Sequence, residues 1–260
     1  MSTETAATLR LPWTSLLSRE DLVRHVARHP MLSWYVPGTS SYLIAGPWRN
    51  REDIVEIYET RGERHRAELW QAVNSQPATH SAVVIDPSEH RSAVHFYRHV
   101  GVRVLEDVLV LRTAALPGLE VRQTLEMVPM RSRGLSTLLD IDHSAFPWLW
   151  RNSRQEFQEY LETPGVGLWV GVLPDQAVGY VGFTTLGGWG HVDRLAVVPQ
   201  LQGLGYGAEL LSWAMRRLYE LGAKYVQLST QGSNERSQPL YTRFGFRPTR
   251  GSYKLYGMYL

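Results

Sequence analysis

The segment His191–Ala208 constrains the fold more than any other part of this 260-residue chain. Its first part, His191–Val198, ends in the apolar run L-A-V-V and is followed by Pro199, which predicts a buried strand that stops at the proline. Three glycines then follow within five residues. After them apolar residues recur with a helical period up to Gly222, a residue type that often ends helices. The segment therefore predicts a strand, a glycine-rich loop and a helix in succession.

A glycine-rich loop in front of a helix is suited to bind phosphate groups. Glycine has no Cβ, so the backbone can turn tightly and bring its N–H groups close to an anion. The first N–H groups of a helix have no partner within the helix, and the helix dipole adds partial positive charge there. We therefore predict a diphosphate site at Gln202–Ala208; the alternative is a glycine-rich surface loop without a ligand.

Two common phosphate motifs fit this segment less well. A Walker loop is absent from the sequence. A dinucleotide fingerprint is a closer rival, because Gly203, Gly205 and Ala208 match its spacing. However, these glycines lie several residues past the strand, and the next strand, Tyr225–Thr230, does not end in an acid that would hold a ribose. A nicotinamide-dependent oxidoreductase therefore stays as a less favoured alternative.

The segment closely resembles the acetyl-coenzyme A signature of the GCN5-related N-acetyltransferases, the GNAT superfamily. Gln202, Gly205 and Gly207 meet the pattern [QR]-x-x-G-x-[GA], after a strand that ends in L-A-V. Downstream, Asn234 and the run L-Y-T-R-F-G-F at Leu240–Phe246 look like the family's late asparagine and its Y-x-x-x-G-F element. The resemblance implies an α/β fold of the acyl-CoA N-acyltransferase type, a mixed twisted sheet flanked by helices, with acetyl-CoA as cosubstrate and no metal.

The resemblance also implies which residues hold the coenzyme. The strand backbone would hold the pantetheine arm, and one of its N–H groups would point at the thioester carbonyl. The loop and helix start would hold the diphosphate. Asn234 would bond the pantetheine arm, cap the turn before Glu235, or do both. The coenzyme-binding residues expected besides Asn234 and Tyr241 are Leu195, Ala196, Val197, Gln202, Gly203, Leu204, Gly205, Tyr206, Gly207 and Ala208.

Tyr241 is the candidate general acid. It lies at the position from which a phenol of this family reaches the coenzyme sulfur, and a partly buried tyrosine can give its proton to a forming thiolate. The alternative is a core tyrosine that packs the last helix.

His191 and Asp193 are the candidates for accepting the amine's proton. They are two residues apart on one strand and so face the same side of the sheet. Aralkylamine acetyltransferases of this superfamily look similar here, with H-x-H-x-L-A-V, but Asp193 replaces the second histidine. The pair could act together through a water molecule, or Asp193 could bind the ammonium while His191 takes the proton. Alternatively, Asp193 could pair with an arginine such as Arg194.

Aromatic residues lie where the family builds its acceptor site: Phe146, Trp148, Trp150 and Trp189. They suggest an apolar or cationic amine, through burial and cation–π contact. The alternative is that they pack the core.

Composition excludes several other functions. With 27 basic and 25 acidic residues, the charge balance gives no case for binding nucleic acid or an anionic membrane surface. There is no cysteine, so acyl transfer cannot pass through an acyl-cysteine. The first eleven residues lack a basic region followed by an apolar core, so we expect no secretion signal and a cytoplasmic protein. A homodimer contact stays open.

A sequence echo suggests two copies of one fold. F-Y-R-H-V-G-V at Phe96–Val102 resembles Leu240–Phe246, and the strands predicted at Ser81–Asp86 and Tyr225–Thr230 share its offset of 144 residues. At this offset the glycine loop falls on Glu59–Glu63, which has one glycine and two acids and is a poor diphosphate site. Chance similarity of short motifs is the alternative.

We therefore expect a shortened, degenerate GNAT-like domain over residues 1–117 and a catalytic GNAT domain over residues 118–260. Within them, Val121–Met127 is predicted to be a strand, Arg51–Tyr58 a helix, and Pro174–Asp175 the turn of a hairpin. The expected function is transfer of an acetyl group from acetyl-CoA to a primary amine by direct attack in a ternary complex. The alternative is a catalytically silent protein that binds or senses acyl-CoA.

Overall fold

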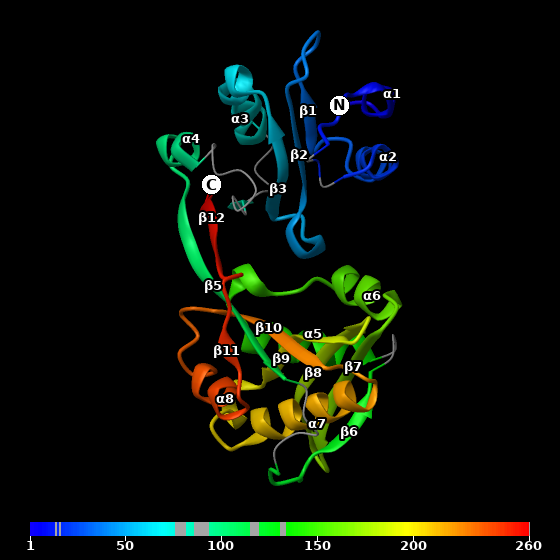
Figure 1. The fold of residues 1–260 in the computed structure, drawn as a ribbon, viewed down its shortest axis with the longest axis vertical. Coiled ribbons are helices and arrows are strands. Elements are labelled where there is room, and N and C mark those ends of the chain that lie inside the picture. The colour runs from blue at the N-terminus through cyan, green and yellow to red at the C-terminus, as the bar shows by residue number, and fades with distance from the viewer. Residues whose placement is uncertain are drawn as a thin grey trace. The chain divides into compact units, whose positions relative to one another are not determined.

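The computed structural model describes residues 1–13, 15, 17–75, 82–85, 94–114, 120–130 and 134–259. It divides into two compact units (Figure 1): Met1–Glu106 with Lys254–Leu260, and Asp107–Tyr253. The boundary predicted between residues 117 and 118 lies outside the described residues. In the described part of the chain, no helix is long and apolar enough to span a membrane.

The second unit contains a mixed sheet, as expected. Its strand order is β5-β10-β9-β8-β7-β6, with the short β11 paired to β5. Among the described strands of this unit, β9 and β10 are parallel to each other, and the other neighbouring strands pair antiparallel. The strands are β5 (Arg103–Ala114), β6 (Glu126–Pro129), β7 (Val166–Leu173), β8 (Gln176–Leu186), β9 (Trp189–Val197), β10 (Tyr225–Gln231) and β11 (Arg247–Pro248).

Helices cover both faces of this sheet. On one face, α7 (Tyr206–Glu220) and α8 (Gln238–Arg243) pack on an apolar cluster that includes Val192 and Val197 of β9. On the other face, α5 (Leu135–Ala145) and α6 (Arg154–Glu162) pack on a cluster that includes Ala196 (Figure 1). β9 thus lies between two cores, which explains its apolar end.

The predicted strand, loop and helix of this unit are present. β9 ends before Pro199 and is followed by a 3₁₀ turn at Pro199–Leu201, the glycine loop and α7. Gly222 has a φ of 85°, a left-handed conformation that favours glycine and follows the end of α7. The predicted hairpin at Pro174–Asp175 joins β7 to β8.

The strand predicted at Val121–Met127 is wrong in its first part, since only Glu126 and Met127 fall in β6. The N–H groups of Thr124 and Leu125 donate instead to the Glu209 carboxylate of α7, at 2.6 and 3.0 Å. A side chain that accepts these hydrogen bonds replaces the ladder that a strand would need. The apolar residues that alternate along this segment therefore pack against the cluster under α7, although the first part of the segment forms no strand.

The first unit has a smaller sheet of the same kind. Its strand order is β1-β2-β3-β4-β12, with β3 and β4 parallel. The strands are β1 (Ser33–Tyr35), β2 (Tyr42–Pro47), β3 (Ile54–Arg61), β4 (Ala82–Ile85) and β12 (Tyr253–Tyr259). The helices are α1 (Thr3–Thr8), α2 (Arg19–Arg28), α3 (Arg66–Asn74) and α4 (Val94–His99).

The helix predicted at Arg51–Tyr58 is wrong, because this segment forms most of β3. Ile54, Val55 and Ile57 are all buried, and β-branched side chains pack well on a sheet. The charged residues beside them, Arg51 to Asp53 and Glu56, fit the solvent side of a helix equally well, so the pattern alone was ambiguous. Pairing with β2 and β4 on both sides decides for the strand.

Both units use the same order of elements. The series β2, β3, α3, β4, α4 in the first unit corresponds to β8, β9, α7, β10, α8 in the second. In the first unit, α3 begins directly after a 3₁₀ turn at Glu63–His65. In the second unit, Gln202–Gly205 lie between the equivalent 3₁₀ turn and α7. The first unit therefore has no residues in place of the glycine loop, and Glu59–Arg61 belong to β3.

Each unit completes its sheet with a strand that follows the other unit's last helix. β5 follows α4 in sequence but pairs with β10, from Ala114 opposite Tyr225 to Val108 opposite Gln231. β12 follows α8 but pairs with β4. The catalytic domain predicted over residues 118–260 included β12, whereas the pairing of β12 with β4 places Lys254–Leu260 in the first unit.

Candidate active site

The centre of the candidate site is the point where β9 leaves β10. The register of this parallel pair ends with Val192 opposite Leu228. Beyond it, β9 stays paired with β8 up to Val197, while β10 stays paired with β5 up to Gln231. Within the described sheet, the β10-facing edge of residues 193–197 therefore has no strand partner. The expected pantetheine-binding residues Leu195, Ala196 and Val197 lie on this edge.

The glycine loop directly follows that edge. The N–H of Gln202 donates to the Pro199 carbonyl at 3.3 Å, and the next N–H of this segment that donates to a described protein acceptor is that of Ala208, to Gly205 at 2.9 Å. The intervening N–H groups, from Gly203 to Gly207, are thus available to a ligand. The Gln202 side chain turns back and donates to the Val197 carbonyl at 2.8 Å.

Two glycines of the loop are required by its conformation. Gly203 and Gly205 have φ values of 83° and 94°, in the left-handed region. A Cβ added at either position would meet nothing within 4 Å, so the space in front of both is open. Gly207 differs, because it lies within α7 and its added Cβ would contact Leu240 at 3.5 Å.

His191 and Asp193 are joined by a hydrogen bond of 2.7 Å between Nδ1 and Oδ1. Asp193 is the extra residue of a β-bulge between β8 and β9, because Gly182 pairs with Arg194 and Phe183 pairs with Val192. Both side chains are only partly exposed, 35% for His191 and 23% for Asp193.

The second oxygen of Asp193 is held from two further elements. Oδ2 accepts from the Tyr160 hydroxyl of α6 at 2.5 Å and from the Thr184 hydroxyl of β8 at 2.7 Å. Burial, with the neighbouring Asp193 carboxylate, raises the pKa of Tyr160 above its ordinary value, which keeps this phenol protonated as a donor. Three donors therefore fix the carboxylate and leave it little freedom to move.

Arg194 does not pair with Asp193, so that alternative is wrong. Because the bulge turns Arg194 to the face covered by α5, its guanidinium bonds the fully buried Asp142 at 2.5 Å. It also donates to the Tyr180 hydroxyl and the Trp150 carbonyl, both at 2.9 Å. This network ties α5 and the aromatic loop to β9.

Tyr241 lies in a small polar cluster next to the end of β10. Its ring is buried on α8, and burial raises the pKa of the phenol, although the hydroxyls of Ser237 and Thr230 oppose this shift. Asn234 belongs to the same cluster, since its amide donates to the Thr230 hydroxyl at 3.4 Å and its carbonyl accepts from Ser237. Asn234 thus does stabilise the turn before α8, as one alternative had it.

The four aromatic residues are divided between two places. The guanidinium carbon of Arg194 lies 4.0 Å from the ring centroid of Phe146. Trp150, whose carbonyl accepts from the same guanidinium, is buried. Trp148 is half-buried in the same 3₁₀ turn. Trp189 lies instead at the start of β9, where it contacts Tyr225 of β10 with ring centroids 5.2 Å apart. The structure therefore does not gather all four into one acceptor site.

Residues 135–246, which include these groups from α5 to the end of α8, match the model of the acetyltransferase (GNAT) family. This part of the chain belongs to the GNAT family. GNAT enzymes are N-acetyltransferases that depend on acetyl-CoA, and the match does not reach into the first unit. The expected recognition, enzyme class and fold class are thus confirmed.

One enzyme is similar in sequence to part of this chain, and two solved structures are similar to it in fold. An N-alpha-acetyltransferase of Sulfurisphaera tokodaii is 31% identical over 107 residues, which cover 36% of this chain and 64% of that enzyme. The structure of a GCN5-related N-acetyltransferase from Kribbella flavida matches with a TM-score of 0.70 at 15% identity. The match covers 100% of this chain and 70% of the Kribbella chain. The structure of a tandem GNAT protein from the clavulanic acid biosynthesis pathway matches with a TM-score of 0.59 at 12% identity. The match covers 99% of this chain and 92% of the chain of that protein. At these identities the two structures establish the fold alone.

The second unit, which contains the matched residues and is called the GNAT unit below, has a loop that fits a diphosphate such as that of acetyl-CoA. The loop from Gly203 to Gly207 offers N–H groups without described protein partners, and its glycines leave open space. This arrangement at the start of the 15-residue helix α7 is suited to an anion. No three His, Asp or Glu side chains cluster in the described residues as metal ligands would.

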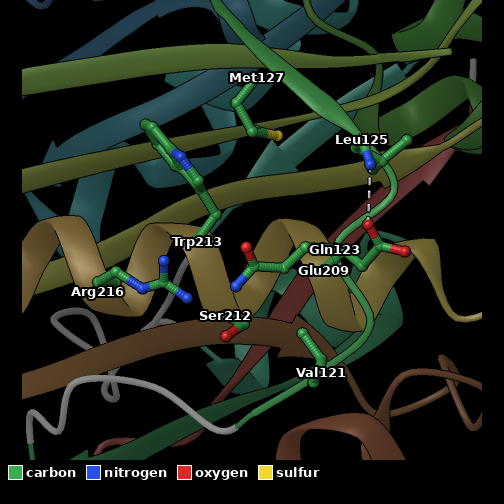
Figure 2. A pocket seen from close by; sticks show the side chains of 8 residues that line it. All are labelled: Val121, Gln123, Leu125, Met127, Glu209, Ser212, Trp213 and Arg216. Atoms are coloured by element: carbon green, nitrogen blue, oxygen red, sulfur yellow. Dashed lines mark hydrogen bonds between the residues drawn. The ribbon is translucent and has the colours of Figure 1, made fainter.

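A small pocket of about 60 Å³ lies on the α7 side of the GNAT unit. Figure 2 shows Glu209 bonding the N–H of Leu125, with Arg216 and Trp213 along the same helix. No residue predicted for the active site lines this pocket. Its Glu209 carboxylate accepts hydrogen bonds from the N–H groups of Thr124 and Leu125 and so holds the segment before β6 against α7. It is lined by Val121, Gln123, Leu125, Met127, Glu209, Ser212, Trp213 and Arg216.

The sequence missed two residues of the GNAT site, Tyr160 and Thr184. Each contacts Asp193 from another element, 33 and 9 residues away in sequence. Thr184 had a usable signal, because a hairpin at Pro174–Asp175 places β8 next to β9. No sequence pattern pointed to Tyr160, because only the packing of α6 on the sheet brings its hydroxyl to Asp193.

Proposed function

We propose that the GNAT unit transfers the acetyl group of acetyl-CoA to a primary amine by direct attack, with amine and coenzyme bound together. The observation that carries this proposal is the His191–Asp193 hydrogen bond at the bulge, one residue past the point where β9 leaves β10. A proton acceptor is thus positioned next to the edge at which the acyl donor is expected. Direct attack requires that proximity.

The coenzyme supplies an activated thioester and a thiolate leaving group. The chain's part is to hold it: the free edge of Leu195–Val197 for the pantetheine arm and the N–H groups of Gly203–Gly207 for the diphosphate. A backbone N–H of the free edge would stabilise negative charge on the thioester carbonyl.

His191 is proposed as the base. The 2.7 Å bond to Asp193 fixes Nδ1 as the donor, which leaves Nε2 able to accept the proton of the amine. Asp193 acts as a positioning residue, because its oxygens already accept from His191, Tyr160 and Thr184. These bonds favour His191 as proton acceptor over an arrangement in which Asp193 binds the ammonium.

Tyr241 is proposed as the acid. The phenol of tyrosine is protonated at neutral pH, and burial, which raises the pKa of Tyr241, keeps it so; it therefore has a proton to give to the leaving thiolate. The hydroxyls of Ser237 and Thr230 beside it oppose this rise in pKa, which favours donation of the proton.

The experiment that tests this function compares wild type, His191→Gln and Tyr241→Phe in acetyl transfer to a panel of primary amines. We expect each variant to lose about 10²–10⁴-fold in kcat, the range that one general acid or base contributes. Both variants should keep most of the affinity for acetyl-CoA, because neither residue belongs to the diphosphate loop and phenylalanine keeps the ring of Tyr241. Tyr219→Phe, which removes a phenol from the exposed end of α7, is the control.

The silent acyl-CoA-binding alternative gives a different result. A sensor would bind acetyl-CoA but turn over no amine, and neither substitution would change any rate. Binding without turnover across the panel would therefore reject the proposed transfer while leaving the coenzyme site intact.

A further inference from the structure

The sheet face that carries His191 also carries a second row of exposed side chains. Strand registers place four residues in one row across β8, β9, β10 and β5: Thr184, His191, Gln227 and Arg112. The neighbouring row is Leu186, Trp189, Tyr225 and Ala114. Because side chains alternate along a strand, residues two apart project from the same face, and both rows therefore share it.

The neighbouring row is an exposed apolar surface. Leu186, Trp189 and Tyr225 are 81%, 47% and 46% exposed, and the two aromatic rings contact each other. Trp189 precedes His191 by two residues, roughly 7 Å along the strand. A surface of this kind beside a proposed base is suited to bind the apolar part of an acceptor.

Arg112 adds a positive charge over this surface. Its guanidinium carbon lies 5.9 Å from the ring centroid of Trp189 and 5.8 Å from that of Tyr225. Among the described residues, no acidic side chain pairs with it. Arg247, opposite it on β11, donates to main-chain carbonyls of Phe246 and Thr242. A guanidinium held over aromatic rings can still present its N–H edge to a carboxylate.

We infer that the acceptor is a primary amine that carries both an apolar body and a carboxylate. This inference rests on the proposed function, because it places the amine at His191. Arg112 and His191 are separated by two strand spacings, roughly 10 Å. An extended chain of three residues spans roughly the same length. The amine would lie at His191, the apolar body on Trp189 and Tyr225, and the carboxylate at Arg112.

The test uses the tripeptide Ala-Phe-Ala as the free acid and as its C-terminal amide. These acceptors share the amine and the aromatic group and differ in one negative charge. In wild type we expect the acid to have a kcat/KM at least about tenfold above that of the amide, an advantage that shrinks as salt is added. Arg112→Gln should remove the difference by lowering the value for the acid alone, and Arg112→Lys should keep part of it. Trp189→Leu should lower both.

Binding separates a failure of this inference from a failure of the proposed function. Calorimetry measures the affinity of both peptides for the protein saturated with coenzyme A. If no amine is acetylated but the acid binds more tightly than the amide only when Arg112 is present, the ligand class stands and the transfer proposal fails. If acid and amide are equal in both turnover and binding, the inference is overturned, whatever the rate of acetyl transfer. Arg112→Gln lowering both peptides equally would also overturn it.

Discussion

At the scale of single residues, the β-bulge at Asp193 is what assembles the proposed site. Without it, neighbouring residues of β9 would point to opposite faces. With the extra residue, Asp193 bonds Tyr160 of α6 while the next residue, Arg194, bonds Asp142 of α5 on the same face. Bulges are enriched next to active sites because they redirect side chains in this way.

Tyr160→Phe tests whether the donors around Asp193 position the base. Loss of the 2.5 Å hydrogen bond should lower kcat by about tenfold, equivalent to roughly 1.4 kcal/mol, while the KM for acetyl-CoA stays unchanged. Thr184→Val should act in the same direction, and the double variant should lose more than either. Stopped-flow or steady-state rates with one amine acceptor are sufficient to measure this. An unchanged kcat in the double variant would show that Asp193 needs neither donor.

His25 gives the first unit a dependence on acid pH. Burial lowers the pKa of this imidazole, Arg28 lowers it further, and the bond of Nε2 to the Ala45 carbonyl opposes the shift. A lowered pKa means that the unfolded chain takes up the proton first. The stability that His25 contributes is therefore complete above about pH 6.5 and is lost as the pH falls through the folded-state pKa.

His25→Gln should remove this contribution, because glutamine keeps an N–H donor but does not titrate. We expect the melting temperature of wild type to fall more between about pH 7.5 and about pH 5.5 than that of the variant. Parallel curves for the two proteins would contradict the assignment.

Part of the site could be predicted at this scale. The alternation rule put His191 and Asp193 on one face, and the left-handed glycines followed from the motif. The Arg194–Asp142 pair could not be predicted, because its partners are 52 residues apart and meet only through the packing of α5 on the sheet. The β-bulge at Asp193 could not be predicted either, because a register shift depends on the sequences of both paired strands.

At the scale of elements, β12 shows that a strand can belong to a sheet far from it in sequence. Tyr256 of β12 packs into the apolar core of the first unit, together with Leu69 and Tyr97. Tyr259, in the same strand, is 62% exposed. The C-terminal strand is thus part of the first unit's core, although the preceding 147 residues form the second unit.

Tyr256→Ala and Tyr259→Ala form a matched pair that tests this assignment. The first should destabilise the first unit by about 3–5 kcal/mol, as expected for a large buried aromatic, and the second by well under 1 kcal/mol. Limited proteolysis should cleave the first unit of Tyr256→Ala while the second unit keeps its affinity for acetyl-CoA. Preferential cleavage within residues 134–253 would contradict the assignment.

Local patterns predicted the elements of the second unit better than those of the first. The period of α7 and the hairpin of β7 and β8 are set by short-range signals. In contrast, β3 has charged residues between its apolar ones, and only its two neighbouring strands select the extended form. The exchange of β5 and β12 has no local signal, because each strand pairs with a partner from the other half of the sequence.

At the scale of the whole molecule, two units with the same order of elements differ in the features that we expect to bind coenzyme. The first unit lacks residues in place of Gln202–Gly205. In addition, Tyr97, which occupies the echo position of Tyr241, is bonded to the Thr60 hydroxyl of β3 at 3.1 Å. Thr60 lies two residues after the extra residue of β3, as Leu195 lies two residues after that of β9, so the phenol of Tyr97 bonds a side chain at the position that corresponds to Leu195. We therefore expect one acetyl-CoA site per chain.

Calorimetric titration of acetyl-CoA into wild type, Gly205→Asn and Gly205→Asp tests whether the glycine loop of the second unit binds the diphosphate. Asparagine and aspartate both tolerate the left-handed conformation, and the two variants differ in charge alone. We predict one site per chain in wild type, a modest loss of affinity in Gly205→Asn, and a further loss of at least about tenfold in Gly205→Asp, because its carboxylate faces the diphosphate. Two sites per chain, or equal affinities for the two variants, would contradict a single diphosphate site at this loop.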